Sequence, residues 1–267
     1  MDQQSRVAVI GAGVMGEALI AALISSGVEP DHITISEKRE ERVQELISKY
    51  SIKAASLAAN VSVADALLLV VKPQDMATVL EEIKGSINPN AVVITFAAGK
   101  TISFICNGLG TSNPVIRVMP NTPTLVGKGM AAASIGAGVT AAQRDFVLSF
   151  LAATGTVIEV SEDLQDAVTA TSGSGPAYFF AFVEAMVTGA KELGLSEKDA
   201  TTLTVQTIVG AAKLLEESGK NATTLRENVT SPNGTTAAAL ASFGDANLNS
   251  IVAKAMKAAR DRSQELA

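Results

Sequence analysis

Residues 6–16, Arg-Val-Ala-Val-Ile-Gly-Ala-Gly-Val-Met-Gly, decide the predicted fold of this chain. A short apolar run typical of a buried β-strand leads into a Gly-x-Gly-x-x-Gly pattern, and a helix-like segment, Glu17–Ser26, follows. In this pattern Gly11 permits a tight turn, Gly13 lets a phosphate approach the backbone, and Gly16 lets the helix pack close to the strand. The helix N-terminus offers N–H groups to an anion. We expect a dinucleotide-binding turn; the alternative is that the glycines serve helix–strand packing alone.

Composition limits the classes of protein to which the chain can belong. Its 267 residues suit one large domain or two modest ones. The net charge of -6 argues against nucleic acid or an anionic membrane as a partner. Apolar runs are too short to cross a bilayer, and the first six residues lack the basic and apolar regions of a signal peptide. We expect a cytoplasmic protein.

Two residue types that often carry chemistry occur only once each. The single cysteine, Cys106, excludes an internal disulfide and a cysteine-built metal site. The single histidine, His32, precedes the second predicted strand near a turn, where a surface position is expected. We therefore expect no metal site and no histidine-based acid–base chemistry.

The first part of the chain alternates between strand and helix patterns. The runs predicted as strands are Arg6–Ile10, Ile33–Ser36, Leu67–Val71, Ala91–Phe96, Val115–Val118, Met130–Ile135 and Thr156–Val160. Amphipathic stretches such as Arg39–Tyr50, Met76–Gly85 and Ala141–Ala153 separate many of them. This alternation predicts an α/β fold with a mostly parallel, doubly wound sheet.

Unusual loops follow five of the predicted strands. These loops are Gly11–Gly13, Glu37–Arg39, Lys72–Gln74, Ala97–Gly99 and Met119–Pro123. In a parallel sheet they share the carboxyl edge, where ligands bind. We expect them to form one site.

The pattern becomes helical after about residue 162. Pro176–Leu193 is predicted as a helix, Ser196 as the N-cap of a second one that reaches about Ser218, and Ala246–Glu265 as the last. We accordingly expect a dinucleotide-binding domain over residues 1–161 and an all-helical domain over residues 162–267.

The segment Thr201–Leu215 is apolar or small on nearly all sides. A helical domain of about a hundred residues covers such a helix poorly by itself. We expect homodimerisation through these helices; a tightly packed monomer is the alternative.

Two glycine-rich segments interrupt the helical part, Thr171–Pro176 and Thr230–Thr236. Each is expected to open a helix with small hydroxyl residues, which makes it a candidate anion site. The alternative is plain capping, but capping needs one hydroxyl, whereas Ser231, Thr235 and Thr236 supply three around a Pro-x-Gly turn. We expect the second segment to bind a carboxylate.

A set of motifs in this order resembles pyrroline-5-carboxylate reductase through nearly the whole chain. They are Gly11–Gly16 (GAGVMG), Val71–Gln74 (VKPQ), Arg117–Pro123 (RVMPNTP), Asp166–Tyr178 (DAVTATSGSGPAY) and Val229–Thr236 (VTSPNGTT). The last two are the most specific. The resemblance implies reduction of 1-pyrroline-5-carboxylate to L-proline with NADPH or NADH, the last step of proline synthesis. It also implies an N-terminal Rossmann domain and a C-terminal helical domain that interlocks with a second subunit.

The resemblance also implies the site residues, by matching position. The substrate would meet Glu162, Thr235 and Thr236, with Ser231 and Gly234 completing the loop. The cofactor would contact Ile10, Gly11, Ala12, Gly13, Val14, Met15, Lys38, Arg39, Val71, Lys72, Pro73, Ala97 and Ala98.

Two positions depart from the family pattern. Asn233 stands where the family usually has glycine, and asparagine tolerates a left-handed backbone. Glu37 ends the second strand, where an acidic residue typically receives the ribose hydroxyls of NAD. Lys38, Arg39 and Arg42 follow it and would favour NADPH if all of them face the site; the alternative is a solvated helix start.

An imine that binds partly as its iminium needs positioning more than strong acid catalysis. Thr236 is the candidate to contact the ring nitrogen. Glu162 either supports the pocket or the iminium charge, or is an exposed acid. Another reductase of similar build, acting on hydroxy acids or other imines, is one rival, but Phe179 stands where such relatives commonly place a lysine. A non-catalytic nucleotide-binding protein is another.

Overall fold

The computed structural model describes residues 4–266. Residues 1–3 and residue 267 lie outside the described residues. Two predictions therefore fall partly outside them: the first domain, which was expected to begin at residue 1, and the N-terminal stretch that lacks the features of a signal peptide. The chain forms two compact units. The first runs up to Ser174 and returns at Ala259, and the second is Gly175–Ala258. This division lies thirteen residues beyond the expected one at 161/162, and the end of the chain rejoins the first unit.

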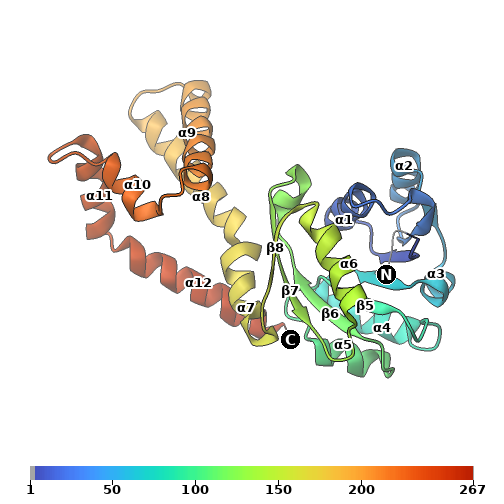
Figure 1. Cartoon of the computed structure of the whole chain (residues 1–267). Helices are drawn as coiled ribbons and strands as arrows, with labels where there is room; N and C mark the ends of the chain where they lie inside the picture. The colour runs from blue at the N-terminus through green and yellow to red at the C-terminus, as the bar shows by residue number, and fades with distance from the viewer. Residues whose placement is uncertain (1–3, 267) are drawn as a thin grey trace. The chain divides into compact units, whose positions relative to one another are not determined.

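The first unit is built on one eight-stranded sheet with the strand order β3-β2-β1-β4-β5-β6-β7-β8 (Figure 1). The strands are β1 (Val7–Ile10), β2 (Ile33–Ser36), β3 (Lys53–Ala54), β4 (Ala66–Leu69), β5 (Val92–Thr95), β6 (Val115–Met119), β7 (Gly129–Ile135) and β8 (Gly155–Glu159). Every neighbouring pair is parallel except β6 and β7. The seven predicted strands and the mostly parallel sheet are confirmed. The two-residue strand β3 was missed because its length gives no periodic pattern.

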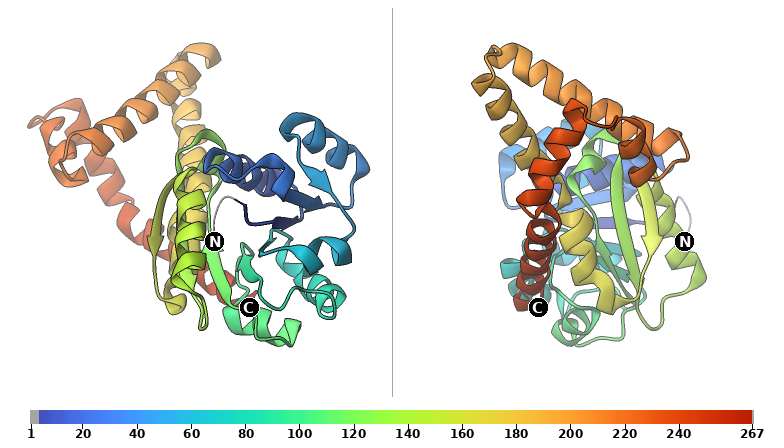
Figure 2. Two further views of the ribbon diagram at one scale, coloured as in Figure 1. Left: turned by 45° about the vertical axis from the view of Figure 1, so that its right-hand side comes forward. Right: turned by 90° about the vertical axis from the view of Figure 1, so that its left-hand side faces the viewer.

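Helices cover both faces of this sheet (Figure 2). They are α1 (Val14–Ser25), α2 (Glu40–Tyr50), α3 (Leu57–Val63), α4 (Met76–Ile83), α5 (Ile102–Leu109), α6 (Ala141–Ala152) and the short α7 (Gln165–Val168). Side chains alternate along each strand, so Val7 and Val9 join one core while Ala8 and Ile10 join the other. Because both faces of the sheet are covered at its centre, the central strands β1 and β4 consist of continuous buried apolar residues. The fold is doubly wound, as predicted.

The reversal at β7 follows from a short connection. Parallel neighbours need a crossover of about a dozen residues or more. The link from β6 to β7, Pro120–Lys128, is shorter and holds only a 3₁₀ turn, Thr122–Val126. The strand after it therefore runs antiparallel to β6.

The second unit consists of helices throughout its described length. They are α8 (Gly175–Glu192), α9 (Glu197–Glu217), α10 (Ala222–Asn228), α11 (Thr235–Asp245) and the larger part of α12 (Leu248–Glu265). The predicted cap at Ser196 is confirmed, because its hydroxyl accepts the Asp199 N–H at 3.1 Å. Phe182 and Phe243 place their rings 6.3 Å apart and so join α8 to α11.

The helix α9 buries little of its apolar surface within the chain. Leu203, Val209 and Leu214 are each more than half exposed, and only Ala200 and Thr204 are buried. The predicted lack of cover on this helix is confirmed. Within residues 4–266, no helix combines the length and the apolar character needed to span a membrane.

The predicted helix Pro176–Leu193 is confirmed by α8, which begins at Gly175 within the segment Thr171–Pro176, but the anion site expected at this helix start is wrong. Thr169–Gly173 forms a π-helical turn directly after α7, and the Ser174 N–H donates to the Thr169 carbonyl at 2.8 Å. The Thr171 and Ser172 hydroxyls donate to the carbonyls of Ala167 and Val168, four residues earlier. A Cβ on Gly173 would lie 2.5 Å from Met119 Cε. The small residues here serve close packing, and they do not form the expected anion site.

The glycine at position 16 provides a test of the packing at the first turn. Alanine is favoured over glycine in a helix by about 1 kcal/mol, but a Cβ here would overlap the Gly11 carbonyl oxygen. We expect Gly16→Ala to lower the free energy of unfolding in urea by about 1–3 kcal/mol. Gly85→Ala, whose Cβ would meet open space, is the control and should change it by less than about 0.5 kcal/mol. A Gly16→Ala protein as stable as the parent would contradict the close contact.

Candidate active site

Three glycines shape the turn between β1 and α1. Gly11 has φ +86°, and a Cβ on it would lie 2.8 Å from the Val70 carbonyl oxygen. Gly16 approaches Gly11 in the same way. Gly13 is different, because no atom lies within 4 Å of the place of its missing Cβ. Two glycines therefore allow backbone packing, and the middle one leaves the backbone open, as the sequence predicted.

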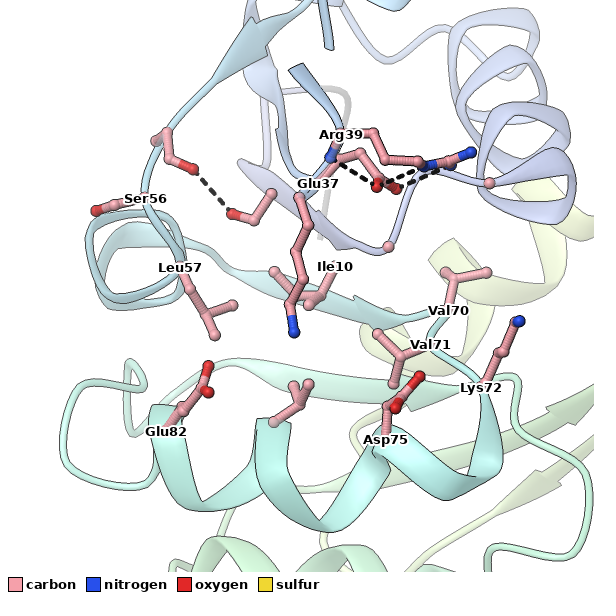
Figure 3. Close-up of a pocket in the computed structure, with 16 residues that line it drawn as sticks. Ile10, Glu37, Arg39, Ser56, Leu57, Val70, Val71, Lys72, Asp75 and Glu82 are labelled. Carbon is pink, nitrogen blue, oxygen red and sulfur yellow. Dashed lines mark hydrogen bonds and ion pairs between the residues drawn. The ribbon is translucent and has the colours of Figure 1, made fainter. Parts of the chain in front are cut away.

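A cavity of about 700 Å³ lies beside this turn (Figure 3). Of the predicted cofactor residues, those that line it are Ile10, Gly11, Gly13, Lys38, Arg39, Val71 and Lys72. The predicted residues outside the lining are Ala12, Val14, Met15, Pro73, Ala97 and Ala98. The carboxyl ends of three adjacent parallel strands, β2, β1 and β4, meet at this cavity, which is why loops distant in sequence share it.

Several residues of the lining were not predicted. They are Ser36, Glu37, Ala55, Ser56, Leu57, Val70, Asp75, Val79 and Glu82. Glu37 was expected near the site, in the loop Glu37–Arg39, and was considered for the choice of cofactor, but it was not assigned as a contact. The residues at 55–57 come from the segment between the short β3 and α3. A serine directly before an apolar helix, as at Ser56, is the signal that could have located this helix start.

The cavity fits a dinucleotide. Gly13 is the N-cap of α1 and has no side chain to cap the helix, so the N-terminal N–H groups of α1 stand beside an open backbone. An uncapped helix N-terminus of this kind suits a pyrophosphate. Leu57, Val70 and Val79 give the cavity an apolar wall, while charged side chains stand around it.

The carboxylate of Glu37 reaches back to the glycine-rich turn. It accepts the Ala12 N–H at 3.0 Å and the Arg39 N–H at 3.1 Å, and the Arg39 guanidinium pairs with it at 3.0 Å. Burial by itself would raise the pKa of this carboxyl. The hydrogen bonds from Arg39 and Ala12 outweigh burial and lower the pKa overall. Glu37 is therefore ionised at neutral pH.

The condition that Lys38, Arg39 and Arg42 all face the site is not met, because Arg42 does not line the cavity. Its guanidinium donates to the Ala12 carbonyl at 3.0 Å and pairs with Glu17 and with Glu45. The pKa of Glu17 is lowered to about 2, mainly by the hydrogen bond from the Lys49 ammonium. Burial by itself would raise this pKa, but further hydrogen bonds from Arg42 and Tyr50 also lower it. Arg42 is held by this ionised carboxylate and does not line the cavity.

Glu162 lies in the first unit and is not a free surface acid. Its carboxylate accepts the Ile102 N–H at 2.6 Å, at the start of α5, and lies 3.4 Å from the Arg117 guanidinium. The Arg117 side chain is 5% exposed and also pairs with Asp166 at 3.5 Å. Asp166 accepts the Ser263 hydroxyl at 2.7 Å. A buried cation in the middle of β6 thus holds two carboxylates in place.

The loop before α11 lies in the second unit. Asn233 has φ +59°, which confirms that asparagine adopts the left-handed backbone there. Gly234 is the N-cap of α11 and donates its N–H to the Ser231 carbonyl at 3.0 Å. No side chain in the described part of the chain caps this helix, so Thr235 and Thr236 begin it with their N–H groups uncapped by any hydroxyl. The segment opens a helix as predicted.

Comparison with known proteins identifies the family. A family model described as pyrroline-5-carboxylate reductase dimerisation matches residues 162–266, and one described as NADP oxidoreductase, coenzyme F420-dependent, matches residues 6–99. The pyrroline-5-carboxylate reductase of Corynebacterium melassecola is 41% identical over 264 residues, 97% of this chain and 98% of the relative. The chain belongs to the pyrroline-5-carboxylate reductase family.

Solved structures agree with this membership. The pyrroline-5-carboxylate reductase of Coxiella burnetii is 34% identical and has a TM-score of 0.90, with 99% of each chain covered. The pyrroline carboxylate reductase of Plasmodium falciparum, solved with NADP bound, is 26% identical with a TM-score of 0.88, covering 100% of this chain and 99% of that one. The reductase fold therefore extends over the whole chain.

The buried ion network of this reductase yields a prediction. Replacing Arg117 with methionine leaves Glu162 and Asp166 without their shared cation, so we expect the free energy of unfolding to fall by about 2–4 kcal/mol. The matched control is Arg144→Met, because Arg144 also pairs with two carboxylates but is 42% exposed. That variant should lose less than about 1 kcal/mol. Equal losses in urea denaturation would show that the burial of Arg117 has no special effect.

Proposed function

We propose that this chain catalyses the reduction of 1-pyrroline-5-carboxylate to L-proline with NADPH, accepting NADH as well, as the final step of proline biosynthesis. The observation that carries the proposal is full-length identity of 41% to a reductase of that name. The open glycine turn and the uncapped loop before α11 support it, because they offer one anion site for a pyrophosphate and one for a carboxylate.

The first unit provides the cofactor site in this proposal. The N-terminus of α1 and the open backbone at Gly13 hold the pyrophosphate, and the apolar wall of the cavity holds the adenosine part. The remaining predicted cofactor residues, including Ala97 and Ala98, stay assigned to it. When bound, the reduced nicotinamide supplies a hydride to the imine carbon.

The second unit provides the substrate loop. The N–H groups at the start of α11 and the hydroxyls of Ser231 and Thr235 bind the carboxylate of the ring. The Thr236 hydroxyl contacts the ring nitrogen and fixes the face that receives hydride. Bond order then falls from C=N to C–N, and the nitrogen keeps the proton that it carries as an iminium. Glu162, fixed by Ile102 and Arg117, supports the positive charge of that iminium.

We propose further that the protein is a homodimer or a dimer-based oligomer of the cytoplasm, without nucleic-acid or membrane partners. The dimerisation model that matches residues 162–266 supports this assembly, as does the exposed apolar surface of α9. The match starts at residue 162, which supports the expected boundary of the substrate-binding and dimerisation domain.

The direct test is NADPH absorbance during incubation with 1-pyrroline-5-carboxylate, with 2-hydroxy acids and their keto forms assayed in parallel. We expect the NADPH absorbance to fall with the cyclic imine, and L-proline to appear. Turnover of a hydroxy- or keto-acid pair alone would favour the rival reductase. If no substrate is turned over, the alternative of a non-catalytic nucleotide-binding protein is favoured.

The role of Thr236 can be tested separately. We expect Thr236→Ala to lower turnover at least tenfold, which corresponds to about 1.4 kcal/mol of barrier, with unchanged affinity for NADPH. Thr236→Ser should recover most of the turnover because it restores the hydroxyl. Thr223→Ala, in α10 outside the loop, serves as the control. If Thr236→Ala turned over at the parent rate, the contact with the ring nitrogen would be wrong.

A further inference from the structure

Glu37 is fixed at the point where β2 meets the glycine-rich turn. The Gly11 N–H donates to the Ser36 carbonyl at 3.0 Å, so the two segments are joined directly. The Glu37 side chain is 10% exposed, and the Ala12 N–H holds one of its carboxylate oxygens at 3.0 Å. Its carboxylate therefore has a defined position on the wall of the cofactor cavity.

The cavity is not a cationic one. Three cationic side chains line it, Lys38, Arg39 and Lys72, and so do three carboxylates, Glu37, Asp75 and Glu82. Their charges cancel, whereas a site dedicated to a 2′-phosphate would be expected to carry an excess of positive charge. Figure 3 shows Glu37 and Arg39 on one side of the cavity and Lys72, Asp75 and Glu82 on the other.

The cationic side chains near Glu37 differ in their ion-pair partners and in their exposure. Arg42 is turned away by Glu17 and by the Ala12 carbonyl. Arg39 pairs with Glu37 through Nε at 3.0 Å and Nη2 at 3.3 Å, yet its side chain is 63% exposed. Lys38 is exposed and lines the cavity. Arg39 can exchange partners, while the buried carboxylate stays in place.

We propose that Glu37 determines which adenosine ribose this chain prefers: its carboxylate accepts the ribose hydroxyls of NADH and repels the 2′-phosphate of NADPH, while Arg39 and Lys38 offset that repulsion. The proposal rests on the cofactor half of the proposed function. An ionised carboxylate accepts hydrogen bonds from hydroxyls but has no proton to donate to a phosphate. NADPH binds when Arg39 leaves Glu37 for the phosphate, and NADH binds with the pair intact.

The test compares Glu37→Gln with the parent protein. Glutamine keeps an oxygen that can accept the Ala12 N–H but removes the charge. Dissociation constants for NADPH and NADH are measured by nicotinamide fluorescence, and those for 2′,5′-ADP and 5′-ADP by calorimetry, all without the imine. We expect the dissociation constant for NADPH divided by that for NADH to fall at least tenfold in Glu37→Gln. The dissociation constant for 2′,5′-ADP divided by that for 5′-ADP should fall as well.

Two further variants separate charge at this position from charge in general. Arg39→Ala should weaken NADPH at least tenfold and NADH less than threefold, because only the phosphate needs the guanidinium. Glu45→Gln removes a carboxylate that pairs with Arg42 but does not line the cavity, so the ratio should stay within twofold.

The outcomes are decisive in both directions. A ratio unchanged within twofold in Glu37→Gln overturns the proposal, including the case in which both cofactors weaken equally because the turn has lost order. A ratio that shifts as much in Glu45→Gln overturns it too. Failure of the proposed reduction would appear in turnover by the parent enzyme, whereas failure of this proposal appears in binding ratios, so the two are distinguishable.

Discussion

The architecture of this chain depends on one close backbone contact, between Gly16 of α1 and the carbonyl of Gly11. No side chain fits between them, and a Cβ on Gly11 would itself lie 2.8 Å from the carbonyl oxygen of Val70, the residue after β4. This contact brings the first turn of α1 down onto the carboxyl edge of the sheet. The N-terminus of the helix then opens beside the ends of β1, β2 and β4, where the cavity lies. A helix set farther from the strand would leave its N–H groups away from that edge.

Charged side chains hold the same turn from both sides. The N–H of Ala12 is bound by the Glu37 carboxylate, and its carbonyl by the Arg42 guanidinium. Both partners come from the end of β2 and the start of α2. Arg42 is held in place by its ion pair with Glu17, and the Glu37 side chain is only 10% exposed. The residues at the end of β2 that line the cavity thus also order the backbone of the glycine-rich turn.

The sequence predicted well those features that depend on neighbours along the chain. The strands, the capped start of α9 and the left-handed Asn233 were all read from local patterns and are confirmed. The segment Thr171–Pro176 was misread because glycine and serine suit both an anion-binding helix start and tight helix packing. The contact of Gly173 with Met119, more than fifty residues away, decided between them. The sequence left open whether Arg42 faces the site, because its partner Glu17 lies on another helix.

The sequence by itself determined the alternation of strands and helices, the glycine turn and the helical second half, because hydrophobic periodicity and backbone preference act over a few residues. Its motifs also carried the family resemblance. Only the tertiary structure decided which charges face the cavity, that Glu162 rests on Arg117, and that the end of the chain rejoins the first unit. Ion pairs and burial depend on residues brought together by folding, and spacing along the chain contains no measure of their distance in space.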